Sequence, residues 1–174
     1  MTIGAALFDT ALGTCGVAWS GTGIVRIVLP DASADVTRAR LVEAYDDARE
    51  MKPPRDVKRA IDAMTALLAG DLRDLGDVAL DMSHVPDFHR RVYEVARTIP
   101  AGETLSYGEV ASRAGSPKGS RAVGQALGKN PFAIVVPCHR VLATGGKVGG
   151  FTAHGGTDTK RAMLAVEKAP APKP

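Results

Sequence analysis

The chain has 174 residues, 45% of them hydrophobic and 24% charged, which fits one ordinary folded domain or a small domain joined to a medium one. No apolar run approaches the roughly 18 residues that span a membrane, and the amino terminus lacks the pattern of a secretory signal. We therefore expect a cytoplasmic protein without a membrane partner. Its two cysteines, Cys15 and Cys138, would then be free thiols, and no Cys-x-x-Cys or His-x-x-x-His spacing predicts a metal site.

Charge is distributed unevenly along the chain. Residues 1–82 contain 9 Lys and Arg against 13 Asp and Glu, a balance of −4, whereas residues 83–174 contain 13 against 6, a balance of +7. A basic carboxy-terminal half suits a polyanionic partner such as nucleic acid, although an ordinary solvated basic surface would have the same composition.

The first section of the chain predicts a small α+β unit. Its expected elements are three strands, two helices and a further strand, at residues 6–10, 14–20, 23–30, 36–51, 57–69 and 75–82. The strands alternate apolar and polar residues between glycine-containing turns, and the helices carry apolar residues at helical spacing on either side of Pro53-Pro54. Cys15 lies in the second strand, where we expect an inert, structural thiol.

The second section predicts mainly helices. An amphipathic helix at 86–99 is followed by two short helices at 106–115, with Ser106 as its N-cap, and at 120–128. Two short helices around a tight turn in a basic region are typical of a helix-turn-helix, although any antiparallel helix pair has the same pattern. A last helix at 157–167 is expected to start at a Thr/Asp cap.

The fold class expected from these elements is α+β. A small N-terminal domain with a β-sheet, residues 1–82, would be followed by a mainly helical domain with a helix-turn-helix, residues 83–168. The Pro-rich residues 169–174 would form a disordered tail.

Cys138 is the residue best placed for chemistry. Pro137 ends an apolar run, Cys138 and His139 follow, and a glycine-rich segment comes soon after. A thiolate is the reactive form of cysteine, and a neighbouring base or cation generates it at neutral pH. A lone cysteine is more commonly a small buried residue, but this polar, glycine-rich setting favours a reactive site.

Three segments carry a family resemblance. SYGEVA, SRAVGQALGKNPFAIVVPCHRV and GGF…GG, in this order, resemble the O(6)-alkylguanine-DNA alkyltransferases, also called methylated-DNA–protein-cysteine methyltransferases; the likeness covers roughly residues 84–168. It implies a DNA repair protein that moves the alkyl group from O6 of guanine irreversibly onto Cys138, once per molecule, without a cofactor. It also implies, more loosely, a ribonuclease-H-like N-terminal domain.

The resemblance assigns roles around Cys138. His139 would take the thiol proton through a water, and Glu167 would orient His139, although the sequence alone favours a surface glutamate at a helix end. Asn130 would fix the approach to Cys138 by bonding local backbone, which a plain turn asparagine also does. Pro137 would fix the entering backbone, and Arg140 would be structural.

The resemblance also implies how DNA is bound. Arg121 would replace the base that is flipped out of the duplex and Tyr107 would press on the adjoining phosphate, although a surface arginine and a half-buried tyrosine are the ordinary alternatives. Small residues on the second short helix would allow a close approach to the minor groove: Ser120, Ala122 and Gly124. The partner would be double-stranded DNA containing O6-alkylguanine, bound by a monomer with little sequence specificity and sensitivity to salt; cooperative binding on DNA is left open.

The segment 148–156 resembles the loop that covers the flipped guanine. Its expected contact residues are Val148, Gly149, Phe151 and Thr152. Phe151 stands where many family members have a tyrosine, so Thr152 would supply a hydroxyl instead. Two additional residues follow in this loop and bring in His154, which could contact DNA or simply lie in solvent.

Two other functions are compatible with parts of the pattern. Family relatives that lack the cysteine recognise damage without repairing it, but Cys138 is present here. A cysteine hydrolase would use Cys138 and His139, yet side chains of adjacent residues rarely meet as nucleophile and base.

Overall fold

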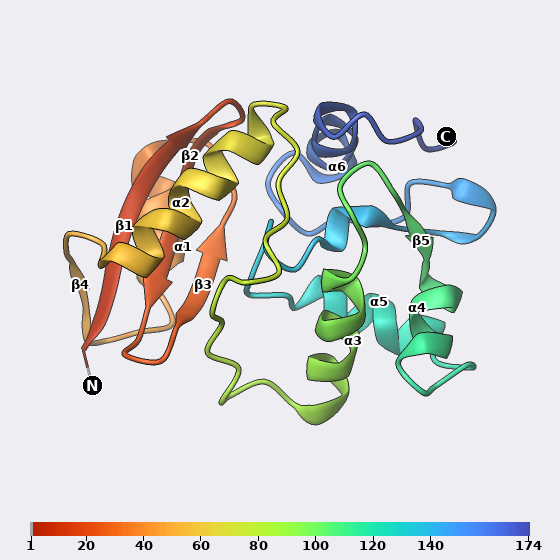
Figure 1. Cartoon of the computed structure of the whole chain (residues 1–174), viewed down its shortest axis with the longest axis horizontal. Helices are drawn as coiled ribbons and strands as arrows, with labels where there is room; N and C mark the ends of the chain where they lie inside the picture. Colours follow the sequence, from red (N-terminus) through yellow and green to blue (C-terminus); the bar gives the residue numbers. More distant parts are fainter. Residues whose placement is uncertain (1) are drawn as a thin grey trace. The chain divides into compact units, whose positions relative to one another are not determined.

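The computed structural model describes residues 2–174 and contains, within them, a four-stranded sheet, a two-stranded sheet and six α-helices (Figure 1). The chain divides into two units. The first runs to Ser83 and also includes Pro131–Val135; the second consists of His84–Asn130 and Val136–Pro174. The sequence predicts this division one residue earlier, after residue 82, and does not indicate that residues 131–135 belong to the first unit. Within residues 2–174, the helices are all too short or too polar to cross a membrane.

The first unit is organised around a four-stranded sheet. Its strands are β1 (Ile3–Thr10), β2 (Gly13–Trp19), β3 (Ile24–Val28) and β4 (Ala48–Glu50), in the order β3-β2-β1-β4. The first three strands are antiparallel neighbours, as their alternating pattern predicts, and β4 runs parallel to β1. Gly13, at φ +124°, allows the tight turn between β1 and β2. Cys15 of β2 is fully buried, opposite Phe8.

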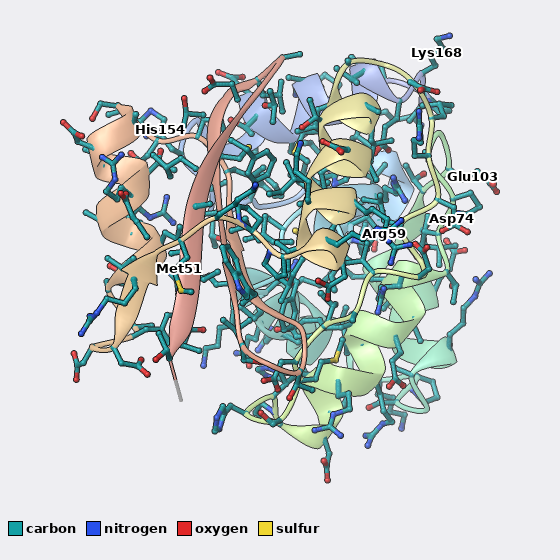
Figure 2. All side chains as sticks on the ribbon, turned by 60° about the vertical axis from the view of Figure 1, so that its left-hand side comes forward. Met51, Arg59, Asp74, Glu103, His154 and Lys168 are labelled. Atoms are coloured by element: carbon teal, nitrogen blue, oxygen red, sulfur yellow. The ribbon has the colours of Figure 1, made fainter. Side chains whose placement is uncertain are left out.

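Two helices cover the two faces of this sheet. Figure 2 shows α1 (Ala34–Val42) on one side of the strands and α2 (Arg55–Leu68) on the other. The predicted second helix is confirmed, but the first was expected over residues 36–51 and ends at Val42. Residues 48–50 form β4 instead, with Ala48 opposite Ile3, because extended backbone there can pair with the edge of β1 that β2 leaves open.

The strand expected at residues 75–82 is not present. Only Leu80 forms an isolated bridge, to Ile24, while the Ile24 amide donates to Ala79 O at 3.0 Å and the Asp81 amide donates to Ile24 O at 2.8 Å. The segment therefore pairs with the sheet through a single bridge. Together with α2 it lines a cavity of about 330 Å³, whose wall includes Arg59 and Asp74 (Figure 2).

The second unit is mainly helical. Its elements are α3 (Asp87–Arg97), β5 (Leu105–Ser106), α4 (Tyr107–Arg113), α5 (Ser120–Gly128), the 3₁₀ helix η1 (Cys138–Arg140), β6 (Val141–Leu142), the 3₁₀ helix η2 (Thr144–Gly146) and α6 (Gly156–Val166). Helices α3, α4 and α5 pack on one another. Parallel pairing of β5 with β6 joins the start of α4 to the end of η1 (Figure 1).

Helices α4 and α5 are joined by residues 114–119. Ser106 is the N-cap of α4, as predicted, and forms a complete capping box with Glu109. The cap fixes the start of α4, where Tyr107 is the first helical residue. Helix α5 follows directly after Gly119 and has no side-chain cap.

Two expectations for the end of the chain were wrong. Helix α6 begins at Gly156, preceded by Gly155 in the left-handed conformation (φ +84°), and not at a Thr/Asp cap. Residues 169–174 were expected to be disordered, but the Lys173 amide donates to Gly146 O at 2.8 Å and Pro172 is buried. Proline-rich composition disfavours regular structure, yet it does not prevent an extended segment from pairing with a neighbouring loop.

Candidate active site

Cys138 begins the short helix η1. The left-handed backbone of Ile134 (φ +74°) and the following Pro137 turn the chain out of a buried apolar segment, and the Cys138 amide donates to Val136 O at 2.8 Å. As a result Cys138 is partly exposed, whereas Cys15 is buried and its pKa is raised to about 11 by burial. Of the two cysteines, only Cys138 is open to contact with a reacting molecule.

His139 and Glu167 meet in the interior. His139 Nε2 and Glu167 Oε1 are 2.8 Å apart, and both side chains are almost fully buried. With Glu167 ionised, Nε2 carries the proton and donates it, so Nδ1 is left as the acceptor; Nδ1 has no hydrogen-bonding partner among residues 2–174. Burial lowers the pKa of His139 despite the nearby carboxylate, so the imidazole is neutral at pH 7 and can accept a proton.

Arg140 holds Glu167 in place. Its Nε donates to Oε2 at 2.9 Å and its Nη2 donates to Oε1 at 2.7 Å, while Nη1 donates to Ile99 O at 2.6 Å. Burial alone would raise the pKa of Glu167, but hydrogen bonds from His139 and Arg140 and the positive charge of Arg140 lower it to about 2. The carboxylate is therefore ionised at all ordinary pH values.

Asn130 lies between α5 and the cysteine segment. Its Nδ2 donates to Val136 O at 2.9 Å, which is the expected bond to local backbone. Burial raises the pKa of the Cys138 thiol, and this effect is opposed by a hydrogen bond from the Asn130 side chain and by the charge of Lys160. Asn130 thus both braces the chain before Cys138 and favours the thiolate.

Lys160 is a site residue that the sequence did not predict. It is fully buried on α6, and its Nζ donates to Val141 O at 2.7 Å and to Gly150 O at 3.4 Å. Burial lowers its pKa to about 8, although the Cys138 thiolate acts in the opposite direction. The available signal was its position, because Lys160 shares the buried face of α6 with Met163, Leu164 and Glu167, where a lysine is unexpected.

Tyr107 also lies in this group. Its ring is half-buried, with Lys160 Nζ 5.7 Å from the ring centroid, and both burial and the Cys138 thiolate raise its pKa. A Cβ added to Gly149 would lie 3.1 Å from the Tyr107 hydroxyl. The structure therefore brings Tyr107 together with Cys138, Lys160 and the glycine-rich loop.

The remaining DNA-binding candidates line α5. Ser120 and Arg121 are exposed, and Ala122 and Gly124 are half-buried. Among residues 2–174, Arg121 has no hydrogen bond or ion pair, so its guanidinium is available to a ligand. Gly124 is close to Tyr107, because a Cβ added there would lie 4.0 Å from the ring.

The loop candidates Val148, Gly149 and Phe151 are half-buried, and Thr152 is exposed. Thr152 Oγ1 donates to Gly128 O at 3.2 Å, which connects the loop to the end of α5. His154 is exposed, and its carbonyl accepts a hydrogen bond from Thr159 Oγ1 at 2.7 Å. No cluster of three or more His, Cys, Asp or Glu side chains suited to a metal occurs within residues 2–174.

Comparison with known proteins identifies the family. The sequence profile described as "6-O-methylguanine DNA methyltransferase, DNA binding domain" matches residues 87–169. The methylated-DNA–protein-cysteine methyltransferase of Mycobacterium bovis is 44% identical over 140 residues, which cover 79% of this chain and 82% of that protein. This chain belongs to the methylated-DNA–protein-cysteine methyltransferase family of DNA repair enzymes.

Solved structures agree with this membership. The crystal structure of Mycobacterium tuberculosis OGT in complex with DNA matches with a TM-score of 0.77 at 37% identity, covering 97% of this chain and 96% of that one. The methyltransferase of Methanothermobacter thermautotrophicus is 35% identical over 152 residues, covering 87% of this chain and 78% of that protein. The family relationship thus extends across both units of the chain.

Proposed function

We propose that this protein repairs DNA by transferring the alkyl group from O6 of guanine to the sulfur of Cys138. The observation that carries this proposal is the partly exposed Cys138 directly before the buried His139–Glu167 pair, in a chain of the methylated-DNA–protein-cysteine methyltransferase family. The sulfur–carbon bond forms as the carbon–O6 bond breaks. The electron pair of the broken bond stays with guanine, which takes up a proton.

The thiolate is generated by His139. The thiol proton passes through a bridging water to the free Nδ1 of His139, and the imidazolium that forms is stabilised by the 2.8 Å contact of Nε2 with Glu167. Arg140 keeps Glu167 ionised and oriented, so it acts on the reaction through His139. Asn130 and Lys160 offset part of the cost of desolvating the Cys138 thiolate.

The reaction occurs once per molecule. Its product is a thioether, in which sulfur is bonded to two carbons and offers no leaving group that hydrolysis or thiol exchange can use. Cys138 is therefore not regenerated. The residues proposed to react all lie in the second unit, so we propose that a monomer is sufficient.

We propose that α4 and α5 form the helix-turn-helix that binds DNA. The small residues Ser120, Ala122 and Gly124 allow α5 to approach the minor groove closely, and the unpaired Arg121 is free to fill the gap left by a flipped base. Contacts of this kind depend on the phosphate backbone, so binding is weakly sequence-specific and weakens with salt. Tyr107, at the start of α4, braces the flipped nucleotide beside Cys138.

The loop from Val148 to Gly156 is proposed to cover the base. Backbone groups of Val148 and Gly149 and the ring of Phe151 are proposed to contact the flipped base. Thr152 can offer its hydroxyl to the base once its bond to Gly128 O is exchanged. Because Phe151 lacks the hydroxyl that a tyrosine would have, the Thr152 hydroxyl is proposed to replace it.

The test is to count alkyl groups removed. Protein is mixed with an excess of duplex containing one O6-methylguanine, and the methylated base that remains is measured over time. The proposal predicts a burst that stops at one base restored per protein, unchanged in Cys15→Ser and absent in Cys138→Ser. Continuous turnover would contradict the single-use mechanism; tight binding of the damaged duplex without restoration would instead indicate a damage-recognition protein.

A further inference from the structure

The C-terminal tail is paired with the loop that follows the active-site cysteine. The Lys173 amide donates to Gly146 O at 2.8 Å, and the Val148 amide donates to Lys173 O at 3.3 Å, so Lys173 and Lys147 form a parallel bridge. Both hydrogen bonds involve only the backbone of Lys173. Its side chain is exposed. The tail therefore adds one backbone bridge to the loop.

Helix α6 holds the tail in this position. Arg161 Nη1 donates to Pro172 O at 3.1 Å and Nη2 donates to Lys173 O at 3.4 Å. Pro172 is buried. A guanidinium that contacts two successive carbonyls fixes both the position and the direction of the segment.

The loop has few other contacts that could fix it. Its hairpin is closed by the Ala143 amide, which donates to Lys147 O at 2.8 Å, and it contains Gly145 and Gly146 at positive φ. Glycines contribute no side-chain packing and lose more conformational entropy than other residues when they are ordered. Backbone pairing with the tail thus supplies order that the loop sequence does not.

Lys160 holds the same loop from the other side. Its Nζ binds Val141 O and Gly150 O, one on each side of the hairpin, while the adjacent Arg161 holds the tail. Of these two successive residues of α6, Lys160 therefore fixes both flanks of the loop and Arg161 fixes the tail that pairs with it. The fixed stretch leads directly into Gly149, which packs against Tyr107.

We propose that Pro172–Lys173, held by Arg161, is a strap that positions the substrate loop for alkyl transfer, and that Arg161 is a positioning residue. The proposal rests on the proposed function, because it assigns to the loop the task of covering the flipped base. The strap orders Val148 and its neighbours before the substrate arrives. Without it, DNA still binds through α4 and α5, but the base is held in the reactive geometry for a smaller fraction of the time.

The strap can be removed without deleting a domain. Lys173→Pro removes the N–H that binds Gly146, and a chain ending at Ala169 removes the whole segment. Lys173→Ala is the matched control, because it changes the side chain at the same position and keeps the amide. Arg161→Ala tests the anchor, and Arg161→Lys keeps the charge but lacks the two-pronged geometry.

The measurements are the rate of methyl transfer at saturating O6-methylguanine duplex, the Kd for that duplex, and hydrogen exchange of the Val148 amide. We expect Lys173→Pro, the truncation and Arg161→Ala to slow transfer roughly three- to tenfold with a Kd within about twofold of the unaltered protein. Exchange at Val148 should accelerate, while exchange within α6 and the midpoint of urea unfolding stay unchanged. Lys173→Ala should match the unaltered protein in every measurement.

The proposal is contradicted if Lys173→Pro and the truncated chain transfer methyl groups at the rate of the unaltered protein and hydrogen exchange of the Val148 amide is unchanged. It also fails if their transfer slows only in proportion to a fall in unfolding stability. If the unaltered protein transfers no methyl group, the proposed function fails; Val148 exchange then still decides whether the tail orders the loop.

Discussion

The Glu167 carboxylate contacts the Arg140 guanidinium through both of its oxygens, at 2.9 Å from Nε to Oε2 and 2.7 Å from Nη2 to Oε1. Oε1 also accepts a hydrogen bond from His139 Nε2. A buried carboxylate is costly unless it is paired and hydrogen-bonded, and this one has three donors. The orientation of the proposed base is thus tied to an ion pair that also stabilises the fold.

This ion pair predicts acid sensitivity. The folded pKa of Glu167, about 2, lies below its ordinary value of 4.5, so its contribution is complete above the ordinary value and is lost as pH falls towards 2. The shift corresponds to about 3 kcal/mol of unfolding free energy. The lowered pKa of His139 also makes the fold less stable in acid. As the pH falls, His139 takes up its proton in the unfolded chain at a higher pH than in the folded protein, which favours unfolding.

Urea unfolding between pH 6 and pH 3 measures this dependence. Glu167→Gln should be less stable at pH 6 and should show a shallower loss of stability on acidification. Glu103→Gln, at an exposed position (Figure 2), is the control and should behave as the unaltered protein does. Parallel acid profiles for the unaltered protein and Glu167→Gln would contradict the assignment.

Lys160 should support the thiolate by its charge. Lys160→Met keeps most of the buried chain and removes the cation, and we expect methyl transfer at pH 7 to slow by about tenfold or more, since 1.4 kcal/mol of thiolate stabilisation is a factor of ten. The Lys160 charge is present below its pKa of about 8 and lost above it. The advantage over Lys160→Met should therefore shrink as pH rises through 8, whereas exposed Lys168→Met should have no effect. A ratio of rates that does not change with pH would exclude the charge as the cause.

Arg121 should act on base flipping and not on the chemical step. Arg121→Ala should slow transfer from a duplex roughly 10- to 100-fold. Unstacking the target base costs a few kcal/mol, and without Arg121 no side chain fills the gap and offsets that cost. The defect should be much smaller on single-stranded DNA, where the target base is already unpaired. Arg113→Ala, with the same change of charge at the end of α4, is the control. An equal defect on both substrates would show that Arg121 contributes elsewhere.

Gly149 should be intolerant of a side chain. It lies at φ +69°, and a Cβ there would come within 3.1 Å of the Tyr107 ring and hydroxyl. Gly149→Ala should cost about 1–3 kcal/mol in strain and slow methyl transfer by displacing Tyr107 or the loop. Gly150→Ala is a close control, since its position is open and has no positive φ. Equal transfer rates for the two variants would show that this contact is unimportant.

The sequence predicted best what depends on local patterns. Alternating residues between glycine turns located the three antiparallel strands, and the Ser106 cap located α4. Long-range pairing was less visible: the sequence predicts helix for the residues of β4, because their partner strand β1 is more than 40 residues away. The tail was read as disordered for the same reason, since its order depends on Gly146, Val148 and Arg161.

The active site shows the same limits. The proximity of Cys138 and His139 is visible in the sequence, but Glu167, 28 residues beyond His139, could be assigned only through family resemblance. Lys160 carried a detectable signal, because it is a charged residue on the apolar face of a helix. Composition and spacing alone do not predict which atoms its ammonium group contacts. Burial and the direction of the side chain determined its role.

Measurement of the intact mass followed by peptide mapping decides whether Cys138 is the acceptor. After reaction with a duplex containing O6-methylguanine, we expect a mass gain of one methyl group per chain, located on the peptide that contains Cys138 and absent in Cys138→Ser. A methyl group on another residue, or an unmodified protein after the duplex has been repaired, would contradict it.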